Sequence, residues 1–338
     1  MIRGLGHMEA RTVDLPLDEN LSFGIQTIHR SSEPADRPWL PQERDGRAFV
    51  EQVDRLGFDS IWCGDHVAFA IPILDPIVQL AQAATYSDRL AIGTCVYLLP
   101  LRHPGPVAKQ IATLDLLSGG RLIFGVGVGG EFQSDFDVSG IPLVERGARL
   151  SESINVLRAL WRGDTASYAG KHFAFEDITM LPAPNQPDGP PVWCGGRQDA
   201  ALRRAGRIAD GYLSYVITPE RFERSLETVA GAYANARRHN GSFGSGHLLF
   251  LRLDQNYETA LEVAAHHLSI RYAMDFREPA KKYCALGSAD DVAETIIRFR
   301  NAGCRTFVLD LIGPCEERSE HLEAVAEELL PLLAAYRE

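Results

Sequence analysis

Apolar residues recur along the chain in two different rhythms. Short runs rich in branched and aromatic side chains, such as 21–26 and 306–312, are typical of strands that are buried on both faces. Longer segments, such as 47–57, space their apolar residues three and four positions apart, which places them on one face of a helix. The pattern therefore predicts that strands alternate with helices.

Eight runs have the composition of buried strands. They cover 21–26, 58–66, 90–100, 121–128, 191–196, 212–216, 247–254 and 306–312. Glycines 57, 206 and 303 stand where a helix is expected to turn into the next strand. Eight strands with intervening helices, in a chain longer than the roughly 250 residues typical of the fold, predict an α/β protein of the (β/α)8 TIM-barrel type. A doubly wound sheet is the alternative.

Two segments depart from this rhythm. Residues 1–20 precede the first strand and are expected to form an N-terminal extension. Residues from about 163 to 189 have a hairpin pattern followed by a proline-rich return, so we expect an insertion after strand four. Residues 21–338 are then predicted to form a single domain.

Composition narrows the function classes. A net charge of -11 argues against a nucleic-acid-binding face and a polybasic membrane surface. No apolar run approaches the roughly 20 residues that span a bilayer, and residues 1–15 have no long apolar segment, so we expect no secretory signal. The six cysteines are scattered without a C-x-x-C, which favours the reducing cytoplasm.

A glycine motif at 125–130 has the form G-x-G-x-x-G, the fingerprint of dinucleotide-binding loops. Such loops belong in the first strand–helix turn and open a helix, whereas this one follows three units and precedes a polar segment broken by Gly140 and Pro142. The dinucleotide interpretation therefore fails. At the C-terminal end of a barrel strand, these glycines instead predict close approach of a ligand to the backbone; a simple tight loop is the alternative.

Two other strand ends carry candidate chemistry. Asp65 and His66 close the second strand, where an imidazole suits acid–base catalysis, although a surface loop histidine is the alternative. Gly195, Gly196 and Arg197 lie between a strand and a helix, an arrangement that presents a helix N-terminus to a phosphate; the alternative is an ordinary turn. Metal and hydrolase chemistry are disfavoured, because the chain has no H-E-x-x-H and no G-x-S-x-G.

Four stretches together resemble the bacterial luciferase-like superfamily of flavin-dependent monooxygenases and deazaflavin (coenzyme F-420) dependent oxidoreductases. These are 56–66, 90–130, 145–163 and 191–213, within a similarity that runs from about Leu21 to Gly313. The block from Pro104 to Gly127, P-x-x-x-A-K followed by T-L-D-x-L-S-G-G-R-L, is the most specific. The resemblance implies a TIM barrel with an insertion after strand four and a flavin or deazaflavin across its C-terminal mouth.

The resemblance also implies roles for individual residues. His66 is similar in position to the family's active-site histidine, and we expect Asp65 to position it. Glu131 matches a catalytic acid of some deazaflavin dehydrogenases. The expected cofactor-binding residues are Thr94, Cys95, Val96, Gly127, Gly129, Gly130, Gly195, Gly196 and Arg197. The family places a non-prolyl cis peptide at Cys95–Val96, whereas the residue pattern alone indicates ordinary strand there.

The expected function is F-420-dependent hydride transfer to or from a small organic substrate. Two departures from FMN-type members favour that branch: glycines and Glu131 replace an arginine after strand four, and Arg197 replaces a serine. One alternative is an FMN-dependent two-component monooxygenase that uses O2; another is a flavin-binding protein without turnover. The expected partners are the substrate, a flavin or deazaflavin reductase and a second copy in a homodimer, with neither nucleic acid nor membrane.

Overall fold

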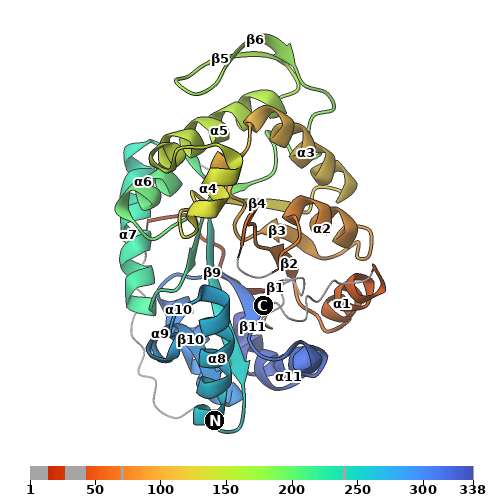
Figure 1. Cartoon of the computed structure of the whole chain (residues 1–338), viewed down its shortest axis with the longest axis vertical. Coiled ribbons are helices and arrows are strands. Elements are labelled where there is room, and N and C mark those ends of the chain that lie inside the picture. The colour runs from red at the N-terminus through yellow and green to blue at the C-terminus, as the bar shows by residue number, and fades with distance from the viewer. Residues whose placement is uncertain (1–13, 27–42, 70–71, 239–240, 338) are drawn as a thin grey trace.

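The structure, a computed structural model, describes residues 14–26, 43–69, 72–238 and 241–337. Most of the expected N-terminal extension lies outside these ranges. Eight parallel strands close into a barrel (Figure 1). They are β1 (Ser22–Gln26), β2 (Ser60–Cys63), β3 (Ala91–Thr94), β4 (Leu122–Val126), β7 (Val192–Gly195), β8 (Gly211–Tyr215), β9 (Gly244–Leu253) and β11 (Thr306–Leu311). The TIM-barrel prediction is confirmed. The doubly wound alternative is wrong, because β8 pairs with β9, β9 with β11 and β11 with β1.

Strand β9 is about twice as long as most of the other strands, and it pairs with two different strands along the same edge. Its first half pairs with β8, from Gly211 opposite Gly244 to Tyr215 opposite Leu248. Its second half pairs with β10 (Cys284–Gly287), a ninth strand that the sequence pattern did not predict. The long strand therefore extends the sheet past β8 on that side.

The connecting helices surround the strands. They are α1 (Glu43–Arg55), α2 (Pro76–Ala83), α3 (Pro104–Leu117), α5 (Arg146–Trp161), α6 (Asp199–Ile208), α7 (Pro219–Asn235), α8 (Tyr257–Tyr272), α9 (Arg277–Tyr283), α10 (Ala289–Asn301) and α11 (Arg318–Ala324). Gly57 and Gly303 follow their helices with positive φ, as predicted. Gly206 does not, since it lies inside α6. A Cβ there would overlap the Val229 carbonyl of α7, so this glycine permits close helix packing.

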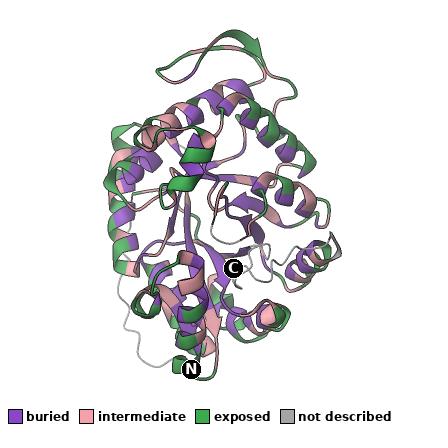
Figure 2. Ribbon diagram, in the orientation of Figure 1, coloured by how far each residue is buried: buried purple, intermediate pink, exposed green. Residues whose placement is uncertain are grey.

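The core fills both the barrel and the layer between strands and helices (Figure 2). Inside the barrel, Trp62 and Trp193 pack at 5.8 Å between ring centroids. Glycines on adjacent strands make room for both indoles: a Cβ at Gly93 would come within 2.5 Å of Trp62, and one at Gly211 within 2.5 Å of Trp193. The interior is thus closed by side chains, as expected for an eight-stranded barrel.

A hairpin of β5 (Thr165–Ala169) and β6 (Ala174–Thr179) lies between α5 and β7 and projects from the barrel in Figure 1. Its tip is tied to α5, because the backbone N–H groups of Lys171 and His172 donate to the Glu152 carboxylate at 3.1 and 2.9 Å. Within the described ranges, no helix is both long and apolar enough to cross a membrane.

Three buried histidines make the stability of this fold sensitive to acid. His247 of β9 has no exposed surface, and its ring stacks on Phe299 at 4.2 Å. Burial lowers the pKa of His247 to about 3, the pKa of His321 to about 3 and the pKa of His267 to about 4. The unfolded chain binds these protons near pH 6.5, before the folded protein does. Stability is therefore lost as the pH falls below 6.5, by up to about 1.4 kcal/mol per pH unit and histidine.

We expect His247→Asn to flatten this pH dependence. Urea unfolding between about pH 7 and pH 5 should show a shallower loss of stability in the variant than in the wild type, since one of the three buried imidazoles is gone. His266→Asn is the matched control, because that histidine is exposed on α8. Equal slopes in the wild type and His247→Asn would contradict the prediction.

Candidate active site

A cavity of about 430 Å³ opens at the C-terminal ends of the barrel strands. It is lined by eleven of the twelve residues predicted for the site. They are Asp65, His66, Cys95, Val96, Gly127, Gly129, Gly130, Glu131, Gly195, Gly196 and Arg197. Thr94 does not line the cavity; it is fully buried, and its hydroxyl donates to the Gly125 carbonyl at 2.6 Å. Residues from distant parts of the chain therefore meet in one space of a size that suits a small molecule.

The Cys95–Val96 peptide is cis, as the family resemblance implied. It lies directly after β3, and both residues face the cavity. Val96 packs between the two glycine loops: a Cβ at Gly127 would lie 2.5 Å from its Cγ2, and a Cβ at Gly195 would lie 3.0 Å from its Cγ1. The two glycines therefore make room for the Val96 side chain at the cavity wall.

The two glycine loops have backbone conformations that favour glycine. Gly129 and Gly130 after β4 have φ values of +62° and +109°, and Gly196 after β7 has +148°. A Cβ on Gly196 would also overlap Ala201 of α6. Helix α6 begins three residues later, so its N-terminus follows the turn at the cavity, as the sequence predicted.

Opposite charges stand across the mouth of the cavity. Arg197 lies 3.7 Å from Glu131, and its guanidinium stacks 4.7 Å from the Tyr215 ring centroid. Both charged side chains are 40% exposed, so this ion pair is open to solvent and weak. The far wall is apolar, with Leu213, Leu248 and Phe250.

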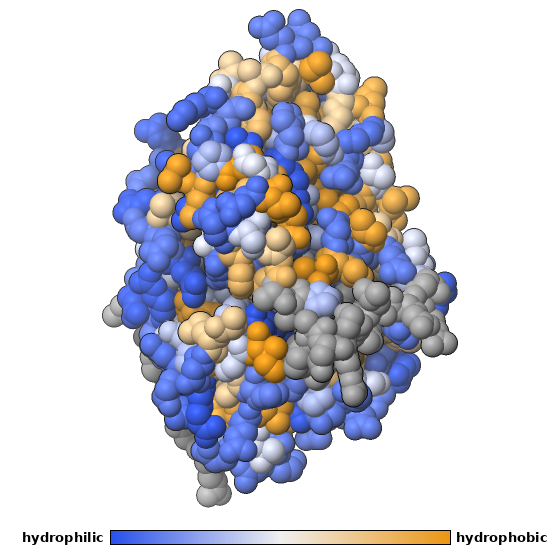
Figure 3. Space-filling view, viewed as in Figure 1, coloured by the Kyte–Doolittle hydropathy of each residue, from blue (hydrophilic) through white to orange (hydrophobic). Residues whose placement is uncertain are grey.

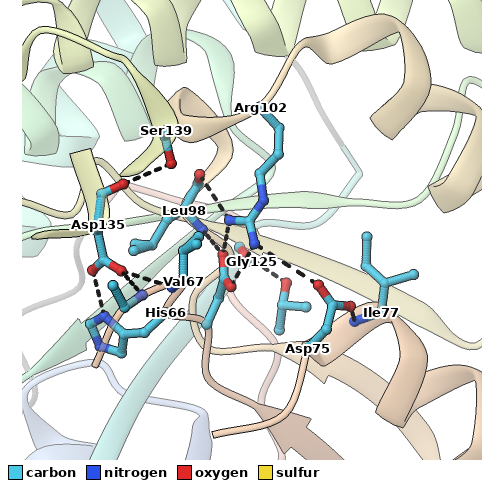
Figure 4. Close-up of polar contacts among 12 residues, drawn as sticks. His66, Val67, Asp75, Ile77, Leu98, Arg102, Gly125, Asp135 and Ser139 are labelled. Atoms are coloured by element: carbon cyan, nitrogen blue, oxygen red, sulfur yellow. Dashed lines mark hydrogen bonds and ion pairs between the residues drawn. The ribbon is translucent and has the colours of Figure 1, made fainter. Parts of the chain in front are cut away.

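His66 is held by Asp135 and not by Asp65, which corrects the expected pairing. Its Nδ1 lies 2.8 Å from Asp135 Oδ2, as Figure 4 shows. The ring stacks on Phe69 at 4.1 Å with an interplanar angle of 3°, and it forms a T-shaped pair with Phe132 at 5.4 Å between centroids. These contacts fix the tilt of the imidazole ring and its rotation about the Cβ–Cγ bond, and the ring lines the cavity.

Asp65 is turned toward a different partner. It is 3% exposed, and both carboxylate oxygens accept from the Arg102 guanidinium, one of them at 2.9 Å. The Leu98 N–H donates to the same carboxylate at 2.8 Å, and Arg102 also lies over the Tyr97 ring. Asp65 therefore ties the end of β2 to the segment after the cis peptide.

Sequence reasoning missed both Asp135 and Arg102. Asp135 belongs to the short helix α4 (Gln133–Ser139), inside the polar segment for which the sequence predicted no element. Hydrophobic side chains gather around α4 on the face shown in Figure 3, whereas α6 and α7 present hydrophilic atoms there.

In the part of the chain that the structure describes, no group of three or more His, Cys, Asp or Glu residues could hold a metal ion.

Comparison with known proteins agrees with this architecture. The chain is 27% identical over 312 residues to an F-420-dependent glucose-6-phosphate dehydrogenase of Microbacterium testaceum, covering 83% of this chain and 90% of that protein. It is 36% identical over 158 residues to an uncharacterised protein of Mycobacterium tuberculosis, 47% of this chain and 54% of that protein. The match thus spans about half the length of the mycobacterial relative. The crystal structure of the monooxygenase RslO1 from Streptomyces bottropensis superimposes with a TM-score of 0.80 at 24% identity, over 92% of this chain and 99% of that one.

The family profile described as luciferase-like monooxygenase matches residues 22–330, from the first strand of the barrel nearly to the end of the chain. That span includes both glycine loops, the cis peptide and His66. The chain therefore belongs to the luciferase-like monooxygenase family.

Proposed function

We propose that the protein is an oxidoreductase that transfers a hydride between coenzyme F-420 and a small organic substrate. The observation that carries the proposal is the convergence of His66, the Cys95–Val96 peptide and two glycine loops on one cavity. The dehydrogenase relative from Microbacterium testaceum, aligned along most of both chains, supports F-420 over FMN.

The residues present fit such a cofactor. The backbone of both glycine loops lines the cavity beside Cys95 and Val96, so a flat ring could lie against this wall. Gly195 and Gly196 in the turn before α6, with the Arg197 guanidinium, would hold the anionic tail through backbone N–H groups and one charge. Gly127, Gly129 and Gly130 would line the part between ring and tail.

The bound deazaflavin would supply the carbon that accepts or donates the hydride. His66 would take the proton from a substrate hydroxyl during oxidation, or return it during reduction, through the ring nitrogen that Asp135 does not occupy. Glu131 stands at the cavity mouth opposite Arg197, where a carboxyl group could serve as a second acid. The apolar wall of Leu213, Leu248 and Phe250 would exclude water from the reacting atoms.

An FMN-dependent monooxygenase is the second candidate, because the matched family profile carries that description. In that case reduced FMN would come from a separate reductase, and His66 would donate or accept a proton beside the oxygen-reactive cofactor.

We also propose, from the family resemblance, that the protein is cytoplasmic and forms a homodimer. Light scattering during gel filtration would test the dimer.

Titration with F-420 and FMN, each oxidised and reduced, tests the proposal. We expect F-420 to bind at least tenfold more tightly than FMN and to be reduced or oxidised when alcohols or carbonyl compounds are screened. Tighter FMN binding with oxygen consumption would favour the monooxygenase. Binding without turnover of any screened substrate would favour the non-catalytic alternative.

Gly196→Ala should weaken cofactor binding by at least about tenfold. Its φ of +148° disfavours any side chain, and the added methyl group would overlap Ala201, so the turn before α6 has to move. Isothermal titration with the preferred cofactor measures the change. Gly231→Ala on α7 is the control, because nothing lies within 4 Å of its Cβ position. Unchanged affinity in Gly196→Ala would show that this turn does not hold the cofactor.

A further inference from the structure

We propose that Asp135 is a positioning residue that decides which ring nitrogen His66 presents to the cavity. This inference rests on the proposed function, since it assigns how His66 is prepared for proton transfer. It concerns a carboxylate 69 residues away from the histidine in the chain and outside the cavity lining.

Every oxygen of the Asp135 carboxylate is engaged. The residue is 1% exposed, and its Oδ1 accepts from the backbone N–H groups of Val67 and Ala68 at 2.7 and 2.8 Å. Its Oδ2 faces His66 Nδ1 at 2.8 Å. An ionised carboxylate can only accept hydrogen bonds, so Nδ1 must carry the hydrogen. Nε2 is then the basic nitrogen of the neutral ring, and it is the one left for a reacting proton.

The same short helix fixes the ring in its plane. Phe132 precedes α4 and packs perpendicular to the His66 ring, while Phe69 stacks on it. Ser134 adds a further link, because its hydroxyl donates to the Ala68 carbonyl at 2.8 Å. Stacking alone would allow the ring to flip by 180° about its Cβ–Cγ bond, which puts Cδ2 in the place of Nδ1 and Cε1 in the place of Nε2. The carboxylate selects one of the two orientations.

Helix α4 also follows the glycine loop directly, since Glu131 and Phe132 join the two. The loop that would receive the cofactor and the group that orients His66 are therefore one continuous segment. This segment, from the glycine loop through α4, would therefore both contact the cofactor and hold the imidazole of His66. Figure 4 shows Asp135 between Ser139 of that helix and His66.

A purely structural role for Asp135 is the competing explanation, because the two backbone hydrogen bonds alone would anchor α4. Asp135→Asn separates the two. The carboxamide oxygen can still accept from Val67 and Ala68, whereas its NH2 group faces His66 and can only donate. Nδ1 then becomes the acceptor and Nε2 carries the hydrogen, so the wrong tautomer faces the cavity with the loops still anchored.

The experiment is ¹⁵N NMR of the full chain labelled at histidine, with the His66 signals assigned by their loss in His66→Gln. We expect the wild type to hold the hydrogen on Nδ1 and Asp135→Asn to hold it on Nε2. Asp135→Glu, which keeps a carboxylate, should retain the wild-type tautomer. Asp137→Asn is the matched control, because that aspartate lies on the same helix but is exposed and bonded to Gln133.

Kinetics complete the test. Asp135→Asn should lower kcat at least about 100-fold with cofactor affinity changed less than about threefold, since proton transfer is affected and the cavity lining is not. A wild-type His66 with its hydrogen on Nε2, or an unchanged tautomer in a folded Asp135→Asn, overturns the inference. The spectra decide this even if F-420 does not bind, whereas absence of turnover in the wild type counts only against the proposed function.

Discussion

His66→Ala should lower kcat for hydride transfer by about 100- to 10,000-fold while the affinity for F-420 changes less than about threefold. General acid–base groups contribute in that range, and the methyl group left behind cannot carry a proton. His66 supplies only one of many surfaces around the cavity, so the cofactor keeps the glycine loops and the Cys95–Val96 peptide. Steady-state kinetics with the reduced or oxidised cofactor, beside a direct titration, separate the two quantities.

Two further measurements sharpen that result. Added imidazole should restore part of the lost rate in His66→Ala, because it can occupy the space that the His66 ring leaves against Phe69 and Phe132. His266→Ala, an exposed histidine on α8, should leave both constants unchanged. Equal losses of kcat and cofactor affinity in His66→Ala would remove its acid–base role and assign it to binding instead.

Arg102→Ala should lower the free energy of unfolding by about 3–5 kcal/mol, the largest stability effect that we expect. In the wild type the Arg102 guanidinium donates to both oxygens of the Asp65 carboxylate, which is 3% exposed. After the substitution only the hydrogen bond from the Leu98 N–H remains of the contacts described above. Removing one partner of a buried ion pair strands the other charge in the protein interior. Urea unfolding monitored by circular dichroism measures the change.

The comparison pair for this prediction lies on the surface. Arg203 and Asp199 also form an ion pair, at 2.7 Å, but each side chain is 64% exposed, so Arg203→Ala should leave the free energy of unfolding almost unchanged. Asp65→Asn combined with Arg102→Ala should recover part of the loss, because the double variant buries no unpaired charge. Similar unfolding curves for Arg102→Ala and Arg203→Ala would show that the pair contributes no stability.

Sequence patterns predicted the barrel because each strand is a local apolar run and each helix a local period. Each of the eight runs overlaps a barrel strand, although 90–100 extends well past the end of β3 and β9 begins three residues before the run at 247. Strand β10 was missed because its four residues, Cys284–Gly287, form no extended apolar run. What makes them a strand is the free second half of β9, which only the folded sheet reveals.

The lining of the cavity was predictable where its residues are close in sequence and follow barrel strands. The pairing of its charged groups was not, because Asp135 with His66 and Asp65 with Arg102 join residues 69 and 37 positions apart. Asp65 precedes His66 in the chain, and adjacency suggested the wrong partner. Neighbouring residues at a strand end point in different directions, so the acidic residue beside a histidine is seldom the one that orients it.

The two tryptophans that close the barrel also give the protein an internal optical reporter. Trp62 and Trp193 pack in one cluster with Leu213 and Leu248, whose side chains line the cavity above them. A flavin or deazaflavin absorbs light where tryptophan emits, so a bound cofactor would accept excitation energy from both indoles. Quenching of the intrinsic fluorescence would then follow cofactor binding directly, without a label and in every variant that keeps the barrel closed.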